Sequence, residues 1–490
     1  MGIIAKQTIR GSALTYAGIG IGFLTAGILL PKFLSKEEIG VLNLLLRSAL
    51  LFSFFANLGF NTITLKLFPF YRNPKNSHNN FFSLKILVNL IGFSLFCTIY
   101  YLFEPYVTER YAQQSKLLVD FLYLVVPFVA IYMVFNALDT YNRVLYNAVQ
   151  GTFLRDFLQR LIILAIIGTL IAGYLNFSGF MYAYVFAMIV PILGLLYYLG
   201  KRKELSISFR SISLTKAQKK EMISVGAFSL FSGIAPILVS SVDLFMVNDY
   251  LGGDKTGVYA TMIFFTTVIV APSKALARIS ATFVADAWKE NDLVKIDDIH
   301  KRSSINQLLF SGLIFLGIWA NMDNLFVVIP EFAEGKFIVF YLGLASLANM
   351  AVGLNNIILS TSHYYKYQTI FVIVLSFILI ISNVLLIPKL GIIGAAVATL
   401  VATLIVNIIK GIFVYVKLKT QPFSIKTILL ISIILVTYLA QDLLPRLHYL
   451  VDIVLRSAII SIIFIGSCYF LKVSDDFNRQ IKKVTKKFIK

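Results

Sequence analysis

Long apolar stretches recur from one end of the chain to the other and leave few options for its fold. A transmembrane helix needs about 20 mostly apolar residues, and runs of roughly that length follow one another along the sequence. We predict fourteen spans, at residues 11–30, 39–60, 81–103, 117–138, 157–175, 179–199, 222–248, 257–282, 305–320, 337–360, 368–387, 391–416, 425–441 and 450–471. The sequence therefore predicts an all-α polytopic membrane protein.

The composition agrees with a membrane-embedded chain. Of the 490 residues, 58% are hydrophobic and 14% are charged, whereas soluble domains carry about 25% charged residues. A net charge of +20 would suggest nucleic acid binding in a soluble chain. Here the basic residues lie mostly in short loops between spans, so we expect no nucleic acid partner. The two cysteines, Cys97 and Cys468, lie in apolar runs and predict neither a disulfide framework nor a metal site.

The distribution of basic residues predicts the orientation. Of the 44 Lys and Arg residues, 29 lie in the terminal segments and in the loops on their side of the membrane, and 8 lie in the opposite loops. Cytoplasmic loops of membrane proteins are enriched in Lys and Arg. We therefore expect both termini to be cytoplasmic.

An internal repeat predicts the domain organisation. "LSKEEIGVL" and "LGGDKTGVY" match at an offset of 217 residues, and "GFMYAYVFA" and "GAAVATLVA" match at an offset of 215. Transporters are often built from such repeats. We predict two six-helix lobes in the same orientation. The predicted parts are an N-lobe at 1–200, a basic cytoplasmic linker at 201–221, a C-lobe at 222–420, two extra spans at 421–472 and a basic cytoplasmic tail at 473–490.

Motifs that would indicate an enzyme are absent from the sequence. It contains no GxxxxGK[ST], no HExxH, no CxxC and no GxSxG, and the loops leave little room for a soluble catalytic domain. We therefore predict a transporter that is not an enzyme, without a cofactor and driven by a proton or sodium gradient.

Charged residues inside the spans are the candidate site residues, because a charge is costly in the bilayer and usually has a function there. Arg47 lies seven residues beyond Gly40, about 10 Å into its span. Lys274 and Arg278 lie four residues apart on one helical face of the repeat-equivalent span. We predict that these cations line a shared cavity and bind an anionic ligand, and that Arg143 extends this surface.

Asp243 is the acid within the seventh predicted span, and it has two alternative roles. It could bind the coupling ion, or it could form a structural ion pair with Arg47. The other charged residues of the spans are expected to extend to the lipid headgroups. These residues are Lys85, Arg160, Lys410 and Arg456.

Two segments resemble a known family. "IRGSALTYAGIGIGFLTAGILLPKFLSKEEIGVLNLL" and "IPKLGIIGAAVATLVATLI" are similar to bacterial polysaccharide flippases, the O-antigen-type members of the multidrug/oligosaccharidyl-lipid/polysaccharide exporter superfamily. The resemblance implies two six-helix lobes around a central cavity that opens alternately to the inner and the outer side (alternating access), with two further C-terminal helices. The related lipid II flippases are similar in these features. There, those two helices form a groove for the polyprenyl tail, and cations on spans one, two and eight face the cavity. Span one departs from that pattern here, with Arg10 at its cytoplasmic end.

This resemblance implies a function. A flippase of the family would carry a polyprenyl-diphosphate-linked oligosaccharide across the bacterial inner membrane, for lipopolysaccharide or another surface polysaccharide. Its partners would be membrane lipids and a glycan polymerase or glycosyltransferases. The alternatives are a cation-coupled multidrug exporter of the same fold and a scaffold without transport activity in a glycan synthesis complex. A small-solute permease is a further alternative.

Overall fold

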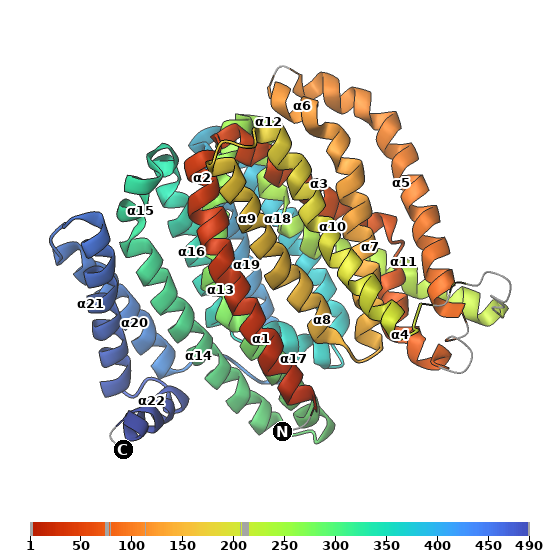
Figure 1. The fold of residues 1–490 in the computed structure, drawn as a ribbon. Helices are drawn as coiled ribbons and strands as arrows, with labels where there is room; N and C mark the ends of the chain where they lie inside the picture. The colour runs from red at the N-terminus through yellow and green to blue at the C-terminus, as the bar shows by residue number, and fades with distance from the viewer. Residues whose placement is uncertain are drawn as a thin grey trace. The chain divides into compact units, whose positions relative to one another are not determined.

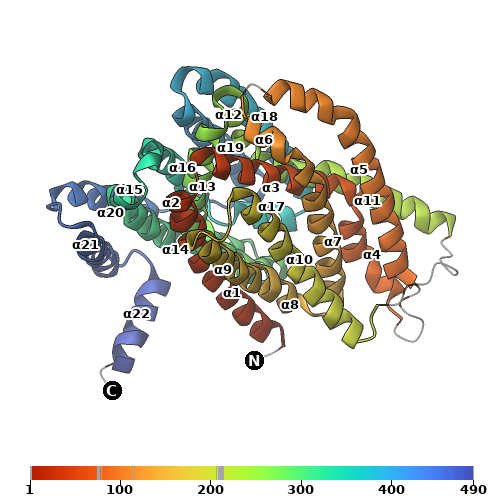
Figure 2. The ribbon, with the colours of Figure 1, turned by 45° about the horizontal axis from the view of Figure 1, so that its top comes forward.

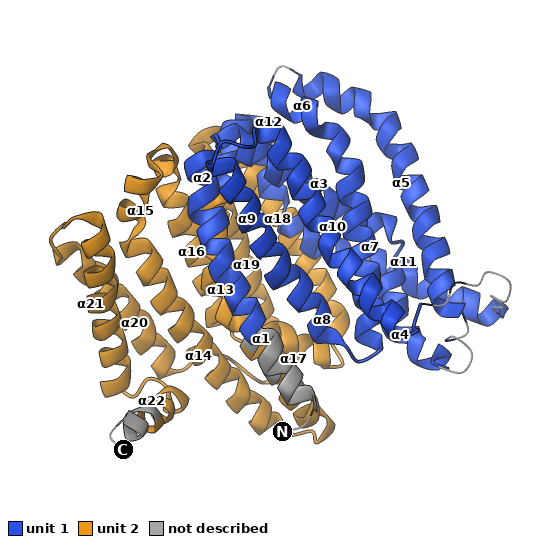
Figure 3. Ribbon diagram, in the orientation of Figure 1, with its two compact units in different colours: residues 1–260 blue, residues 261–490 orange. Residues whose placement is uncertain are grey.

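The computed structural model describes residues 3–73, 78, 80–112, 114–205, 207 and 215–488. At residues 3–12, 231, 274, 275, 278, 279, 282 and 484–488 it describes the backbone alone. Throughout these ranges the secondary structure is helical, without a strand. The chain forms two compact units, residues 1–260 and residues 261–490 (Figure 3). The boundary lies within one long helix, whereas the predicted lobe boundary at 201–221 stays a prediction.

Unit 1 contains the first helices of the chain (Figure 1). They are α1 Ile3–Gly22, π-helix η1 Phe23–Leu29, α2 Leu30–Phe33, α3 Lys36–Ala56, α4 Phe60–Tyr71, α5 Phe81–Tyr111, α6 Lys116–Phe121, 3-10 helix η3 Leu122–Leu124, α7 Val125–Val144, α8 Ala148–Thr152, π-helix η4 Phe153–Leu158, α9 Gln159–Ile171, α10 Phe177–Lys201, α11 Lys216–Val239, α12 Val242–Leu251 and the beginning of α13 Gly253–Lys289.

Unit 2 contains the rest of α13 and the helices that follow. These are α14 Leu293–Ala320, α15 Met322–Val328, 3-10 helix η5 Pro330–Gly335, α16 Lys336–Ala351, α17 Asn355–Thr361, α18 Tyr365–Leu390, α19 Ile392–Leu418, α20 Ile425–Ala440, 3-10 helix η6 Gln441–Leu443, α21 Tyr449–Phe470 and α22 Asp475–Phe488.

Twelve helices of the described part are long and apolar enough to cross a membrane, and the bent pair Pro330–Ala351 and Asn355–Thr361 raises the number to thirteen if it forms one span. The chain is therefore a multi-pass membrane protein. The fifth predicted span accounts for the difference from fourteen. It corresponds to the continuous helical segment 148–171, which carries Arg155, Asp156 and Arg160 and is less apolar for that reason.

The beginning of α3 packs closely against the beginning of α13 within unit 1. Ser35 caps α3, since its hydroxyl accepts from the Glu38 N–H and its own N–H donates to the Glu38 carboxylate. A Cβ on Gly40 would collide with the Gly253 carbonyl, and a Cβ on Gly257 would collide with the Lys36 carbonyl. Glycine at Gly40 and Gly257, which are equivalent in the predicted repeat, thus allows the two backbones to meet.

The last two spans pack on α14 of unit 2. Both α20 and α21 contact α14 and each other, and Figures 1 and 2 show them side by side. The tail forms helix α22, and its first turn is tied to α14. Asn306 accepts from the Ser474 hydroxyl at 2.6 Å and donates to the Asp476 carboxylate at 3.2 Å. The two extra helices and the start of the tail are therefore integral parts of unit 2.

Candidate functional site

Arg47 is a half-buried cation on α3 that has no anionic partner. Among the described residues it forms neither an ion pair nor a hydrogen bond, and Tyr132 on α7 lies within electrostatic range of it. Helices α3 and α7 pack against each other along this stretch. The alternative in which Asp243 pairs with Arg47 is therefore not supported. An uncompensated cation in an apolar helix is the arrangement that an anionic ligand would stabilise.

Arg155 is a second cation near Tyr132, and the sequence analysis did not identify it. Its guanidinium carbon lies 5.2 Å from the centre of the Tyr132 ring and 5.0 Å from that of Phe135. It also donates a hydrogen bond to the Asn136 side-chain oxygen at 3.2 Å. Arg155 lies on the π-helical turn η4, where a wider turn changes the direction of the side chains. The available signal was the charged turn with Arg155 and Asp156 just before the fifth predicted span and Arg160 at its beginning.

Arg160 follows on the same helical segment and contacts the first span. It donates to the Gly18 carbonyl of α1, and its extension to the headgroups stays a prediction. Tyr184 of α10 lies in electrostatic range of Arg160, Arg155 and Tyr132. We call Arg47, Arg155 and Arg160 the arginine cluster. Asp156 is the carboxylate in range of Arg160, and it compensates part of the cluster's charge.

Arg143 is paired, which changes the interpretation of this predicted site residue. It lies in the last turn of α7, and its guanidinium is 2.5 Å from the Asp139 carboxylate. Asp139 is buried, and one of its oxygens lies against Gly151 so closely that a Cβ there would collide with it. The pair neutralises Arg143 in this structure. Its role in extending the binding surface stays a prediction.

Asp243 lies in the first turn of a separate helix, α12, because the seventh predicted span is broken at Ser240–Ser241. The carboxylate is buried and accepts a hydrogen bond from the Tyr259 hydroxyl at 3.0 Å. Its predicted role in ion coupling stays a prediction. In the described part of the chain, no three His, Cys, Asp or Glu residues are grouped as a metal site.

Lys274 and Arg278 are both on α13, four residues apart and thus on one helical face. The backbone there is helical, and their side chains lie outside the described residues. Their contribution to the site stays a prediction.

Two buried lysines are held by neutral groups, so the prediction that they extend to the headgroups is wrong. Lys85 is 1% exposed and donates to the Asn61 side-chain oxygen at 3.0 Å and the Thr64 hydroxyl at 2.9 Å. Lys410 donates to the Asn356 side-chain oxygen at 2.7 Å. Their ammonium groups also lie 5.8 Å from the centres of aromatic rings, those of Phe60 and Phe371. Amide and aromatic groups replace the headgroups at these positions.

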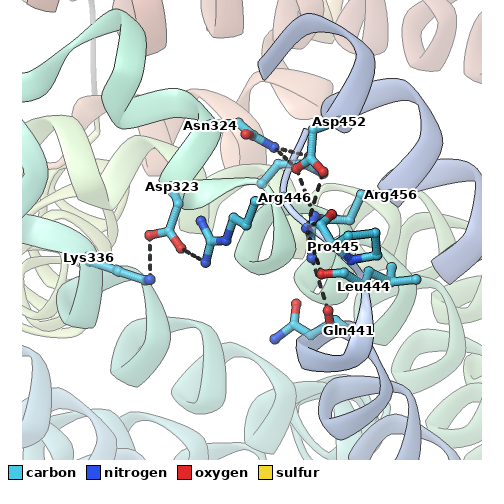
Figure 4. A network of polar contacts seen from close by, with 10 residues as sticks. Asp323, Asn324, Lys336, Gln441, Leu444, Pro445, Arg446, Asp452 and Arg456 are labelled. Carbon is cyan, nitrogen blue, oxygen red and sulfur yellow. Dashed lines mark hydrogen bonds and ion pairs between the residues drawn. The ribbon is translucent and has the colours of Figure 1, made fainter. Parts of the chain in front are cut away.

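Arg456 is buried in an ion-pair network at the beginning of α21, and the prediction that it extends to the headgroups is also wrong (Figure 4). Its guanidinium donates to both carboxylate oxygens of Asp452, at 2.8 and 3.1 Å. It also donates to the Gln441, Leu444 and Pro445 carbonyls. Asn324 donates to Asp452 at 2.6 Å. This network joins α21 to the segment that follows α14.

Apolar grooves lie in both units. In unit 2, a groove of about 320 Å³ between α14, α16 and α20 is lined by Leu308, Phe315, Phe340, Leu344, Leu347, Ala348, Ala351, Ile431, Ile434, Leu435 and Tyr438. In unit 1, a pocket of about 640 Å³ has walls from α3, α5 and α7, with Phe52, Phe96 and Val125 among its lining residues. Such surfaces suit aliphatic chains.

Comparisons with known proteins agree with this geometry. Residues 4–283 match the model of a family described as "Polysaccharide biosynthesis protein". The chain is 23% identical over 259 residues to the "Probable low-salt glycan biosynthesis flippase Agl15" of Haloferax volcanii, covering 51% of this chain and 52% of that protein. The chain thus spans about half the length of the curated relative that it matches.

Solved structures share the fold. The "Lipid II flippase MurJ, inward closed conformation" aligns with a TM-score of 0.69 at 16% identity, covering 95% of this chain and 99% of that one. An inward-facing multidrug resistance MATE family transporter of the MOP superfamily aligns with a TM-score of 0.67 at 14% identity, covering 84% and 98%. At these identities the comparison establishes the fold alone, and it confirms the predicted fold class.

Proposed function

Because this chain belongs to the polysaccharide biosynthesis protein family, we propose that it is a flippase for a polyprenyl-diphosphate-linked oligosaccharide. The cargo would move from the cytoplasmic to the outer face of a bacterial inner membrane, for O-antigen or another surface polysaccharide. The similarity to a glycan biosynthesis flippase and to the structure of a lipid II flippase supports a lipid-linked glycan as cargo.

The observation that carries this proposal is the uncompensated charge of Arg47. A diphosphate that leaves water needs cationic donors along its route, because an unpaired charge is strongly disfavoured in low dielectric. The planar guanidinium matches phosphate oxygens in a bidentate geometry. Arg155, which lies near the same Tyr132 ring, would supply further donors. The arginine cluster thus favours an anionic cargo over a cationic drug.

The groove between α14, α16 and α20 is a suitable site for part of the prenyl tail. Its wall includes α20, one of the two extra C-terminal helices. With a volume of about 320 Å³ it would cover a few isoprene units, and the rest of the tail would stay in lipid.

Orientation, energy source and partners complete the proposal. Both termini would be cytoplasmic, a proton or sodium gradient would drive transport, and Asp243 is the candidate for the coupling ion. A polymerase or glycosyltransferases would use or supply the cargo. Reporter fusions test the orientation: cytoplasmic reporters should be active near Lys203 and Lys295, and periplasmic reporters after Glu109 and Glu334. A periplasmic signal from residue 210 would contradict it.

Transport in proteoliposomes tests the function directly. The protein would be reconstituted with a radiolabelled polyprenyl-diphosphate disaccharide, and an added glycosidase would report which molecules reach the outer leaflet. We expect the protein to make the labelled lipid accessible, at a rate that depends on an ion gradient. Efflux of ethidium without movement of the lipid would favour the multidrug exporter. Movement of neither would favour the scaffold.

A further inference from the structure

A small polar pocket in unit 1 lies next to the arginine cluster and has no assigned role. Its volume is about 120 Å³, and its lining includes Asn61, Thr62, Asn136, Ser229 and Phe54. The remaining lining residues are Leu50, Ser53, Asn57, Gly59 and Ile237. A cavity needs about 10–15 Å³ of such volume to accommodate one water. The pocket is therefore large enough for several waters, or for one sugar ring in their place.

Two cations outside the pocket fix the direction of its amides. Lys85 donates to the Asn61 side-chain oxygen, and Arg155 donates to the Asn136 side-chain oxygen. Each amide therefore uses its oxygen for the cation and keeps its NH₂ group for another partner. Among the described residues neither NH₂ group has a hydrogen-bond partner, and both NH₂ groups retain accessible surface. The two amides are thus held with their donors available at the pocket.

The other polar groups of the pocket are amide groups with partners within the protein, or hydroxyls. Asn57 is hydrogen-bonded through both side-chain polar atoms, since its oxygen accepts from the Asn61 N–H at 2.8 Å and its NH₂ donates to Asn89 at 3.1 Å. The Thr62 and Ser229 hydroxyls are 2.6 Å apart and join α4 to α11. Irregular backbone between α3 and α4, at Asn57–Gly59, lines the same pocket. Within a spanning segment, such backbone is tolerated where it lines a cavity.

The lining indicates the chemistry of the ligand. It contains amides, hydroxyls and one aromatic ring, and no charged side chain. A diphosphate would need a cation in the pocket, and Lys85 and Arg155 are not in its lining. A neutral, hydroxyl-rich ring offers the acceptors that the two NH₂ groups require, and its apolar face can pack on Phe54. The pocket thus suits a sugar better than a phosphate.

The pocket is also at a suitable distance from the arginine cluster. Arg47 and Phe54 are seven residues apart and lie on one face of α3, about 10 Å along the axis. Tyr132 and Asn136 are one turn apart on α7, and Arg155 contacts both. A diphosphate at Arg47 would therefore place the first sugars of the same molecule near the amides.

We propose that the pocket formed by Asn61, Asn136, Thr62, Ser229 and Phe54 binds a sugar unit of the lipid-linked glycan. This inference rests on the proposed function and makes it more specific, because it assigns the diphosphate and the glycan to adjacent sites. Lys85 and Arg155 act as positioning residues, since they orient the amides.

Isosteric variants test the two donors. Asn61→Asp and Asn136→Asp each keep the oxygen that accepts from Lys85 or Arg155 and replace the NH₂ donor by a second oxygen. The matched control is Asn349→Asp in unit 2, where the side-chain oxygen accepts from Asn407 at 3.0 Å and the residue lies outside the pocket. Binding would be measured on the full-length protein in nanodiscs. The probes are prenyl diphosphate without sugar and the same lipid linked to glucose, galactose or N-acetylglucosamine.

We expect the wild type to bind at least one sugar-bearing probe more tightly than the sugarless one. Asn61→Asp and Asn136→Asp should each lower the affinity for that probe about tenfold relative to the affinity for the sugarless probe. Asn136→Asp should also weaken the sugarless probe, because its new carboxylate neutralises Arg155. Asn349→Asp should change neither. Equal binding of all four probes by the wild type, or equal weakening of all probes by the pocket variants, would overturn the sugar pocket. Failure of the wild type to bind even the sugarless probe would instead contradict the proposed function.

Discussion

Two arginines that lie in apolar helices have opposite surroundings. Arg456 of α21 is 6% exposed, and the Asp452 carboxylate and backbone carbonyls satisfy its guanidinium. Arg47 of α3 is half-buried and has neither an ion pair nor a hydrogen bond with a described residue. The comparison shows that a basic residue within a span has a structural role where a carboxylate lies beside it. Where no carboxylate is present, a ligand is the natural partner.

The two buried lysines lie between these cases. Lys85 and Lys410 are desolvated like Arg456, but amide oxygens replace the carboxylate. Such a lysine has its hydrogen bonds satisfied by neutral acceptors, and no described carboxylate pairs with it. In unit 1 this arrangement has a further consequence, because the amide bonded to Lys85 lines the polar pocket. A buried cation can therefore act on a ligand site through a neutral residue.

The largest effect is expected for the structural arginine. Arg456→Ala would leave the Asp452 carboxylate buried with Asn324 as its remaining partner, and breaking a buried ion pair costs about 3–5 kcal/mol. The variant should therefore be scarce in the membrane and should unfold at a lower temperature after purification. Arg456→Ala combined with Asp452→Ala should be less harmful than the single change. Normal abundance and stability of Arg456→Ala would remove the structural side of the comparison.

Arg47→Ala should have the opposite effect. We expect normal abundance and a ten- to hundredfold loss of affinity for the diphosphate, since one charge-assisted hydrogen bond contributes about 1.5–3 kcal/mol. Arg47→Lys should retain part of the activity, because it keeps the charge without the planar donors. Lys66→Ala, at an exposed position on α4, is the control for the loss of a positive charge.

Full transport by an abundant Arg47→Ala protein would contradict the binding role. The pairing alternative has a different result: Arg47→Ala would lower abundance, and Asp243→Asn in addition would restore it. Abundance by immunoblot and transport in the proteoliposome assay separate these outcomes.

Arg143 tests whether an ion pair with a buried carboxylate is a reliable criterion for a structural role. The Asp139 carboxylate is buried, so Arg143→Ala should destabilise the protein by about 1–3 kcal/mol, the cost of an unsatisfied buried polar group. Adding Asp139→Asn should recover much of this loss, and the double variant should still transport. Thermal unfolding and transport would be measured on the same preparations. A stable Arg143→Ala protein without transport would show that Arg143 contacts the cargo.

The sequence predicted the class of fold because its signal is repeated many times. Each apolar run is long enough to specify a span, and the Gly40 and Gly257 repeat positions do lie against each other in unit 1. The partners of the charged side chains were not predictable in the same way. Whether Arg456 reaches a headgroup or Asp452 depends on where α21 begins. Whether Lys85 reaches water depends on where α4 places Asn61. These are tertiary contacts, and a position within a span does not encode them.

Arg155 shows a second limit. The charged turn at 154–160 looks like the edge of a weak span, and a regular helix would give no reason to place Arg155 on Tyr132. The π-helical turn η4 changes the direction of that side chain. Such a turn has no simple sequence signature, so the arginine was found in the structure and not from the pattern of residues.

The smallest expected effect concerns Asp323, outside the spans. Partial burial alone would raise the pKa of this carboxyl, but hydrogen bonds from Lys336 and Arg446 hold the pKa below its usual range. A carboxyl with a lowered pKa in the folded state stabilises the fold above its ordinary pKa of about 4, and this contribution is lost as the pH falls further through the folded-state value. Because the three side chains are partly exposed, we expect this contribution to the folding free energy to be less than about 1 kcal/mol.

The melting temperature of the wild type should thus exceed that of Asp323→Asn slightly at pH 7, and the difference should shrink toward pH 3. Glu331→Gln, at an exposed position nearby, removes the same charge and should show no such pH dependence. A difference of equal size at pH 7 and pH 3 would show that Asp323 acts through packing, and the network of Figure 4 would then depend on Asp452 and Arg456 for its electrostatic contribution.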